Sequence, residues 1–263
     1  MHAIWTGNIS FGLVSIPVKL VSAIKTQEKE HFSLFCEEHQ VPVHYKRWCE
    51  KGEHDVPWDE VMKGMEVGHN KYYLFTKEKL DSLKPHKTET IEIEGFYPHE
   101  EIRTYWIDKH YFLLPGATTA AKPYRLLYEA LLDTEQVALA RFVMHEREHL
   151  AAIKAVDGSR ALFLTTLHYV DEIASLEGAP EIREAVKLEA GELALAKEII
   201  SKHAKKHIEL NRYKDHFAEK LEHLAHGKKV KVEAEPERPA HKSLMDALEA
   251  SVKAAKAARE AEM

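Results

Sequence analysis

The sequence predicts an α+β protein in which a β-rich segment comes first and a helical segment follows. Through roughly the first 175 residues, apolar side chains alternate with polar ones or form short β-branched and aromatic runs bounded by Gly, Pro and Asp. From Pro180 onward, apolar residues recur at helical spacing. The 263 residues suffice for one large domain or two small ones with a real core.

The N-terminal residues 4–20 predict two strands separated by glycines. Gly7 and Gly12 permit bends or a bulge, and Pro17 keeps its own position off a central hydrogen-bonded ladder. Further strands are expected at residues 71–75, 90–94, 105–114, 136–144, 149–156 and 161–167, with a tight turn at Asp157-Gly158-Ser159 before the last. A helical turn is expected at residues 77–83.

A helix over residues 122–132 has Tyr124, Leu127, Tyr128 and Leu131 on one face. Helical spacing then covers residues 182–207, and a second helix over 215–225 ends at Gly227, a favoured C-terminal cap. Residues 228–241 are charged, contain two prolines and have almost no bulky side chains, so they predict a flexible linker.

The last segment, residues 242–263, predicts an amphipathic helix with an apolar stripe. The stripe residues are Leu244, Met245, Leu248 and Val252. Because the helix follows a linker, the stripe fits a partner-docking role. The alternative is a helix that folds back on its own domain.

Composition limits the function classes. The net charge is −6 with a pI of about 6.3, which argues against a uniformly basic nucleic-acid binder but not against a local basic surface. No apolar run approaches the roughly 18–20 residues that cross a bilayer, and the N-terminus does not resemble a signal peptide, so we expect a cytoplasmic protein without a membrane partner. Two cysteines exclude a disulfide framework.

Residues 145–149 match the H-E-x-x-H pattern of zinc peptidases, with His145, Glu146 and His149 in the pattern positions. That chemistry needs a helix, but the flanking residues predict strands. Two histidines four residues apart on a strand stand about 13 Å apart, too far to share a zinc ion. We interpret the match as a polar strand end and the metalloprotease as the competing hypothesis.

A second cluster has the residue types of a structural zinc site. Such a site needs four nitrogen or sulfur ligands, commonly as two closely spaced pairs. Cys36 and His39 form an acceptable first pair and Cys49 supplies a third ligand. Gly52 stands where the fourth is expected, which leaves His54 as the candidate. Reduced thiols and surface histidines without a metal are the alternative.

Basic residues in the first two-thirds of the chain are candidate phosphate contacts. Lys46 and Arg47 lie between Tyr45 and Trp48, a pairing of cations with aromatic rings that suits a phosphate-contacting loop. The full set of candidates is Lys19, Lys25, Lys46, Arg47, Lys63, Lys122, Arg125 and Arg141. They form a DNA-binding surface only if the fold gathers them on one face. The chain contains no P-loop, G-x-G-x-x-G or nucleophile elbow, so we expect no enzyme.

Several motifs in order resemble the prokaryotic Ku proteins. They are the opening segment 4–20 and residues 43–49, 63–66, 122–127 and 164–173, together with the Leu-Met-x-Ala-Leu segment of the tail. The resemblance implies a β-barrel core over residues 1–175, with a zinc-ribbon-like bridge at 31–57 and a helical region at 180–227. It also implies an intertwined homodimer that forms a ring around duplex DNA.

The same resemblance implies a function. Ku proteins bind the ends of linear double-stranded DNA in non-homologous end joining and recruit an ATP-dependent DNA ligase, with its polymerase activity, without catalysis of their own. No cofactor is required beyond a possible structural zinc. The family's ligand pattern is His-x2-Cys then Cys-x2-Cys, from which Cys36, His39 and Gly52 depart.

One conflict remains between charge and function. A ring around DNA needs a basic lumen, whereas this chain is acidic. We therefore expect Asp and Glu to concentrate on the outer face and in the helical C-terminal half. A protein-interaction scaffold without DNA affinity is a third hypothesis.

Overall fold

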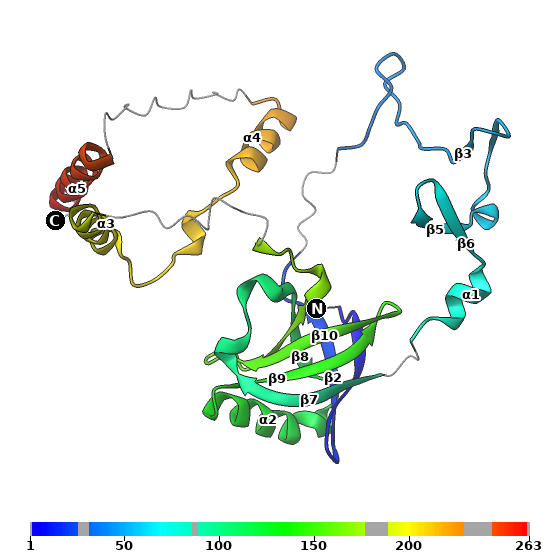
Figure 1. Ribbon diagram of the computed structural model, residues 1–263, viewed down its shortest axis with the longest axis horizontal. Helices are drawn as coiled ribbons and strands as arrows, with labels where there is room; N and C mark the ends of the chain where they lie inside the picture. The colour runs from blue at the N-terminus through cyan, green and yellow to red at the C-terminus, as the bar shows by residue number, and fades with distance from the viewer. Residues whose placement is uncertain (1, 26–31, 86–88, 177–188, 229–243, 262–263) are drawn as a thin grey trace. The chain divides into compact units, whose positions relative to one another are not determined.

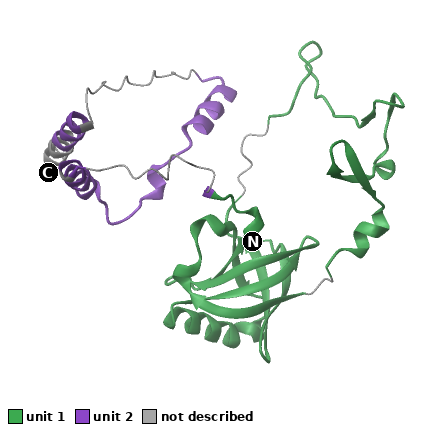
Figure 2. Ribbon diagram, viewed as in Figure 1, with its two compact units in different colours: residues 1–175 green, residues 176–263 purple. Residues whose placement is uncertain are grey.

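The computed structural model describes residues 2–25, 32–85, 89–176, 189–228 and 244–261 and divides them between two units, residues 1–175 and residues 176–263 (Figure 2). Unit 1 contains a closed seven-stranded barrel with strand order β1-β2-β8-β11-β10-β9-β7 (Figure 1). The strands are β1 (Trp5–Phe11), β2 (Val14–Ser22), β7 (Thr90–Pro98), β8 (Ile107–Pro115), β9 (Gln136–Met144), β10 (Arg147–Ala155) and β11 (Leu162–Leu167). The predicted α+β class with a β-barrel core is confirmed.

Neighbouring barrel strands are antiparallel except at one place. There β1 pairs in parallel with β7, through the register Asn8↔Thr90, Ile9↔Ile91 and Ser10↔Glu92. This pair closes the barrel. Strands β2 and β7 lie on either side of β1, and the chain leaves the barrel after β2 and returns to it at β7. The register of β1 with β2 is continuous from Trp5↔Leu20 to Phe11↔Val14, around a turn with Gly12 at φ +58°.

Alternation along the strands builds the barrel core. Ile16, Val18 and Leu20 of β2 are buried, whereas Lys19 between them is only half-buried. Helix α2 (Ala121–Asp133) packs against β9 and β10 and buries Tyr124, Leu127, Tyr128 and Leu131, the face that the sequence predicts. The Tyr124 hydroxyl donates to the Leu113 carbonyl at 2.6 Å and accepts from the Leu162 N–H at 2.7 Å. Burial raises the pKa of this phenol.

The arm, which we define as residues 32–85, lies between β2 and β7 in the chain. It contains two short hairpins and a helix: β3 (Trp48–Cys49) with β4 (His54–Asp55), β5 (Lys63–Gly68) with β6 (Lys71–Phe75), and α1 (Lys77–Ser82). Thr76 caps α1 by accepting a hydrogen bond from the Lys79 N–H. The strand and helical turn predicted at 71–75 and 77–83 are therefore present.

Unit 2 is helical, as predicted. Its helices are α3 (Ala190–His203), α4 (His216–Ala225) and α5 (Leu244–Ala261). Asp215 caps α4 by accepting from the N–H groups of Phe217 and Ala218, and Gly227 follows it at φ +71°. The predicted start of the helical region, at residues 180–188, and nearly all of the predicted linker, residues 229–241, lie outside the described residues.

Candidate nucleic-acid interface

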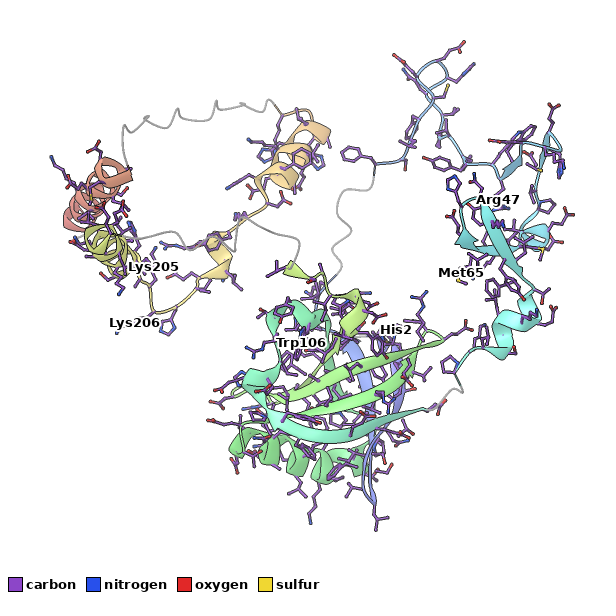
Figure 3. All side chains as sticks on the ribbon, in the orientation of Figure 1. His2, Arg47, Met65, Trp106, Lys205 and Lys206 are labelled. Carbon is purple, nitrogen blue, oxygen red and sulfur yellow. The ribbon has the colours of Figure 1, made fainter. Side chains whose placement is uncertain are left out.

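The predicted DNA contacts fall in three parts of unit 1. Lys46, Arg47 and Lys63 are in the arm, Lys122 and Arg125 are on α2, and Lys19, Lys25 and Arg141 are on or next to barrel strands. Figure 1 shows these elements, and Figure 3 labels Arg47. All except Lys19 are exposed. Among the described residues, the hydrogen bonds, ion pairs and ring contacts of these cations stay within the same part, so the single basic face remains a prediction.

In the arm, the β3–β4 hairpin holds Lys46 and Arg47. The Lys46 ammonium donates to Asp55 at 2.9 Å, and the Arg47 Nε donates to the Val56 carbonyl at 3.1 Å. The Arg47 guanidinium also lies 5.1 Å from the centre of the Trp58 ring. These contacts hold the guanidinium in place through Nε on an exposed residue, a geometry suited to phosphate.

On α2, Arg125 pairs with Glu129 one turn later and lies 5.4 Å from the centre of the Tyr128 ring. Lys122 is exposed one turn before it. Both cations are therefore exposed on α2, with Arg125 at the edge of the buried face beside Tyr128.

Arg141 of β9 is already neutralised. It pairs with Glu94 on the neighbouring strand β7 and, at 3.7 Å, with Glu148 on β10. The hydrogen bond with Glu94, followed by the charge of that carboxylate, raises the pKa of Arg141. A guanidinium between two carboxylates must lose them before it can bind phosphate, so Arg141 is the weakest of the predicted contacts.

Residues 61–84 of the arm contain four lysines besides Lys63, at residues 71, 77, 79 and 84, that the sequence reasoning did not select as contacts. Residues 61–84 carry five Lys and Arg residues against three Asp and Glu, whereas residues 32–60 carry three against seven. In this region Lys79 donates to the Tyr73 hydroxyl at 2.6 Å, and Lys84 bridges Asp81 at 2.7 Å and Glu146 of the barrel at 2.8 Å. The hydrogen bond with Asp81, then that with Glu146, raises the pKa of Lys84. Lys71 and Lys77, which flank the aromatic run from Tyr72 to Phe75, were the available signal.

The predicted zinc ligands form two separate pairs. Cys36 Sγ lies 3.4 Å from His39 Nδ1 in a loop closed by the Phe35–Pro42 bridge. Cys49 faces His54 across the β3–β4 hairpin. Within the residues that the structure describes, no group of three or more His, Cys, Asp or Glu side chains is placed to hold a metal ion. The four-ligand site is not assembled, because each hairpin closes around its own pair.

The H-E-x-x-H residues do not lie on a helix. His145 and Glu146 form the two-residue turn between β9 and β10, with φ of 51° and 65°, and Arg147 pairs directly with Met144. Strand β10 therefore begins two residues before the predicted residue 149. The His149 ring packs against Phe142 with centroids 5.6 Å apart and its Nε2 lies 3.3 Å from the Met144 carbonyl oxygen. This arrangement removes the structural basis of the metalloprotease hypothesis.

The expected charge distribution is partly wrong. Residues 1–175 carry 20 Lys and Arg against 26 Asp and Glu, whereas residues 176–263 carry 17 of each. The acidic excess therefore belongs to the unit that contains the barrel, not to the helical C-terminal half.

Across the described segments, no helix has both the length and the hydropathy to cross a membrane.

The C-terminal helix α5 packs against α3 within unit 2. Val252 is buried, Met245 and Leu248 are half-buried, and Met245 Cε lies 3.5 Å from a Cβ built at Gly191. The Leu244 side chain lies outside the described residues. The apolar stripe thus has a neighbour in its own chain, as in the alternative that the sequence left open.

Comparisons with known proteins agree with this architecture. A family model described as "Ku70/Ku80 beta-barrel domain" matches residues 10–195. The chain is 35% identical, over 97% of its length and 86% of the relative's, to the "Non-homologous end joining protein Ku" of Anaeromyxobacter sp. (strain K). The corresponding protein of Archaeoglobus fulgidus is 33% identical over 97% of this chain and all of its own length, and that of Pseudomonas aeruginosa is 37% identical over 88% and 78%. The chain belongs to the Ku family of non-homologous end joining proteins.

Proposed function

We propose that this chain binds the ends of linear double-stranded DNA without sequence specificity, as a ring-shaped homodimer, and recruits an ATP-dependent DNA ligase and its polymerase activity for end joining. Residues 1–227 form the DNA-binding core, 228–241 the linker and 242–263 the docking helix. The arm is the observation that carries the proposal. None of residues 32–85 is buried, and even the large apolar side chains of Trp48, Trp58 and Leu74 are each more than half exposed.

The β5–β6 hairpin has apolar side chains on both faces, and these need a cover. In the register of β5 with β6, Met65 pairs with Tyr73 on one face and Gly64 with Leu74 on the other, and all three large side chains are exposed. Monomeric soluble proteins rarely leave a contiguous apolar surface of this kind open. A second copy is the cover that needs no further partner, and two-fold symmetry gives each arm the same environment.

The cations suit contact with the DNA backbone. Lys46, Arg47 and Lys63 of the arm, with the other lysines of residues 61–84, supply charge for contacts with phosphate, and phosphate contacts carry no sequence information. Binding should therefore weaken steeply with salt through counterion release. Acidic side chains elsewhere in the barrel unit do not oppose this if they lie away from the DNA.

The decisive experiment compares linear duplex with covalently closed circular duplex of the same sequence. A closed ring loads only at an end, so linear DNA should bind and the circle should not; linearising the circle with a restriction enzyme should restore binding. Equal affinity for both forms would refute the ring. No affinity for either would favour the interaction scaffold.

Ligase recruitment is tested through the tail. Deleting residues 242–263 should leave end binding intact and remove stimulation of the ligase. The double variant Met245→Asp/Leu248→Asp should have the same effect, whereas Glu249→Ala, on the exposed side of α5, should not. Unchanged stimulation after the deletion would mean that the ligase docks on the core.

A further inference from the structure

A cationic pocket lies in the segment that joins α3 to α4. It has a volume of about 330 Å³ and is open to solvent. Its lining includes the cationic or titratable side chains of His203, Lys205, His207 and Arg212, together with the ring of Tyr213. The volume is at the lower end of the range of small-molecule sites, about 300–1,000 Å³.

The local backbone explains how these side chains meet. Helix α3 ends at His203, and Ala204 continues in an extended conformation. The chain then turns through the short 3-10 helix at Leu210–Arg212, where the Tyr213 N–H donates to the Leu210 carbonyl at 3.0 Å. The turn places Arg212 and Tyr213 in the same lining as Lys205, which lies two residues after the end of α3. Figure 3 labels Lys205 in this segment.

The segment carries an excess of positive charge. Residues 202–228 carry seven Lys and Arg residues and five histidines against four Asp and Glu. Glu209 is the carboxylate of the pocket, and it accepts from Arg212 Nε at 3.0 Å, which leaves the terminal amino groups of that guanidinium without a partner among the described residues. Across the same described segments, Lys205 and Lys206 have no ion pair or hydrogen bond.

Large apolar side chains accompany this charge. Tyr213 is 77% exposed, and Ile208, also in the lining, is 80% exposed. Four residues after Tyr213, Phe217 exposes another ring at the start of α4. Cations with open aromatic faces are the composition of surfaces that bind single-stranded nucleic acid, because any unpaired base can stack on a ring. A site for phosphate alone would have no use for Tyr213 and Ile208.

We propose that this pocket binds one unpaired nucleotide of a single-stranded DNA overhang. Lys205 and Arg212 contact its phosphate, and Tyr213 stacks on its base. A base inside a duplex is stacked on its neighbours and offers no free face, so blunt DNA does not use the pocket. The proposal takes from the proposed function only that the ligand is DNA.

The test uses the full-length protein and fluorescence anisotropy with four labelled probes. They are a blunt duplex, the same duplex with an oligo-dT 3′ overhang, the same with an abasic overhang of equal length, and free oligo-dT. The abasic overhang keeps the phosphates and lacks the bases. We expect the oligo-dT overhang to bind about tenfold more tightly than the abasic one, which corresponds to stacking of one base.

Variants assign the preference to the pocket. Tyr213→Ala should abolish the difference between the two overhangs, and Tyr213→Phe, which keeps a ring, should restore it. Lys205→Ala should weaken binding to both overhangs and lower the salt slope by about one. Lys197→Ala removes an exposed lysine of α3 outside the pocket and serves as the matched control.

Several outcomes would overturn the proposal. They are equal affinity for blunt and overhanging duplex, equal affinity for the two overhangs, or no effect of Tyr213→Ala. Tighter binding of a labelled polyglutamate peptide than of oligo-dT would assign the pocket to an acidic protein segment instead. Absence of binding to the blunt duplex alone would count against the proposed ring. The affinity for free oligo-dT, with and without Tyr213→Ala, would still test the pocket.

Discussion

Gly7 of β1 lies against Glu89, the residue that precedes β7. Its neighbour Asn8 donates to the Glu89 carbonyl at 2.8 Å, just before the parallel pairing of β1 with β7 begins. A Cβ built at Gly7 would stand 2.3 Å from that carbonyl oxygen and 2.4 Å from the Trp5 ring. The Trp5 ring is itself held, because its Nε1 donates to the Val143 carbonyl at 3.0 Å. A side chain at position 7 would therefore clash with the backbone of Glu89 or with the Trp5 ring.

We expect Gly7→Ala to destabilise the barrel. The added methyl group must displace either backbone or a hydrogen-bonded indole, and overpacking of this kind costs about 1–3 kcal/mol. The measurement is urea unfolding followed by tryptophan fluorescence. Gly68→Ala is the matched control, since a Cβ there meets nothing within 4 Å. A stability equal to that of the control would mean that β1 and β7 do not approach as described.

The turn of the β9–β10 hairpin has a backbone geometry that its two residues disfavour. Its two-residue turn requires positive φ at both positions, which favours Asn-Gly, but the chain has His145 and Glu146 there. The ion pair of Glu146 with Lys84 does not offset much of the strain, because the two side chains are 51% and 37% exposed.

Replacing the turn with His145→Asn/Glu146→Gly should stabilise the protein by about 0.5–2 kcal/mol, since both new residues tolerate left-handed backbone. The midpoint of thermal unfolding should rise, and binding to linear duplex should not weaken, because the change removes a carboxylate beside Lys84. Glu146→Gln removes the ion pair but keeps the strained turn, so it should lower the midpoint slightly or leave it unchanged. If the double variant has a lower midpoint, the Lys84 contact outweighs the strain.

Local sequence patterns predicted most helices and strands. The predictions that were wrong or incomplete mostly depend on contacts between residues far apart in the sequence. Period-two alternation located the strands, and the 3.6-residue period located the buried face of α2. The turn at His145 was interpreted as a strand end, because neither residue is typical of positive φ. The neutralisation of Arg141 depends on Glu94, 47 residues earlier. The zinc pairs were identified locally, but four ligands converge only if two hairpins meet, and no pattern in one hairpin reports on the other.

The exposed arm of the whole molecule leads us to expect self-association. The chain has a mass of 30.2 kDa, so the proposed dimer should have about twice that mass in solution. Met65 and Leu74 lie on opposite faces of the β5–β6 hairpin and are 56% and 57% exposed in the single chain. A charge on each face would oppose burial against a second copy.

Met65→Glu/Leu74→Glu should therefore dissociate the dimer at low micromolar concentration, as measured by size-exclusion chromatography with light scattering. It should also remove end binding. Val170→Glu places a carboxylate at a residue that is 87% exposed outside the arm, and should remain dimeric. A dimer that persists in the double variant would exclude this hairpin as an interface.

The single parallel pair that closes the barrel also bears on how the chain folds. Asn8 and Thr90 meet only after the whole arm has left β2 and returned, whereas the β1–β2 and β9–β10 pairs join residues close in sequence. Contacts of long sequence separation carry the loop-closure entropy that slows folding. The seam between β1 and β7 should thus form late. Because that entropy grows only with the logarithm of loop length, about 0.6 kcal/mol for each doubling, the arm can lengthen or shorten at little cost to the barrel.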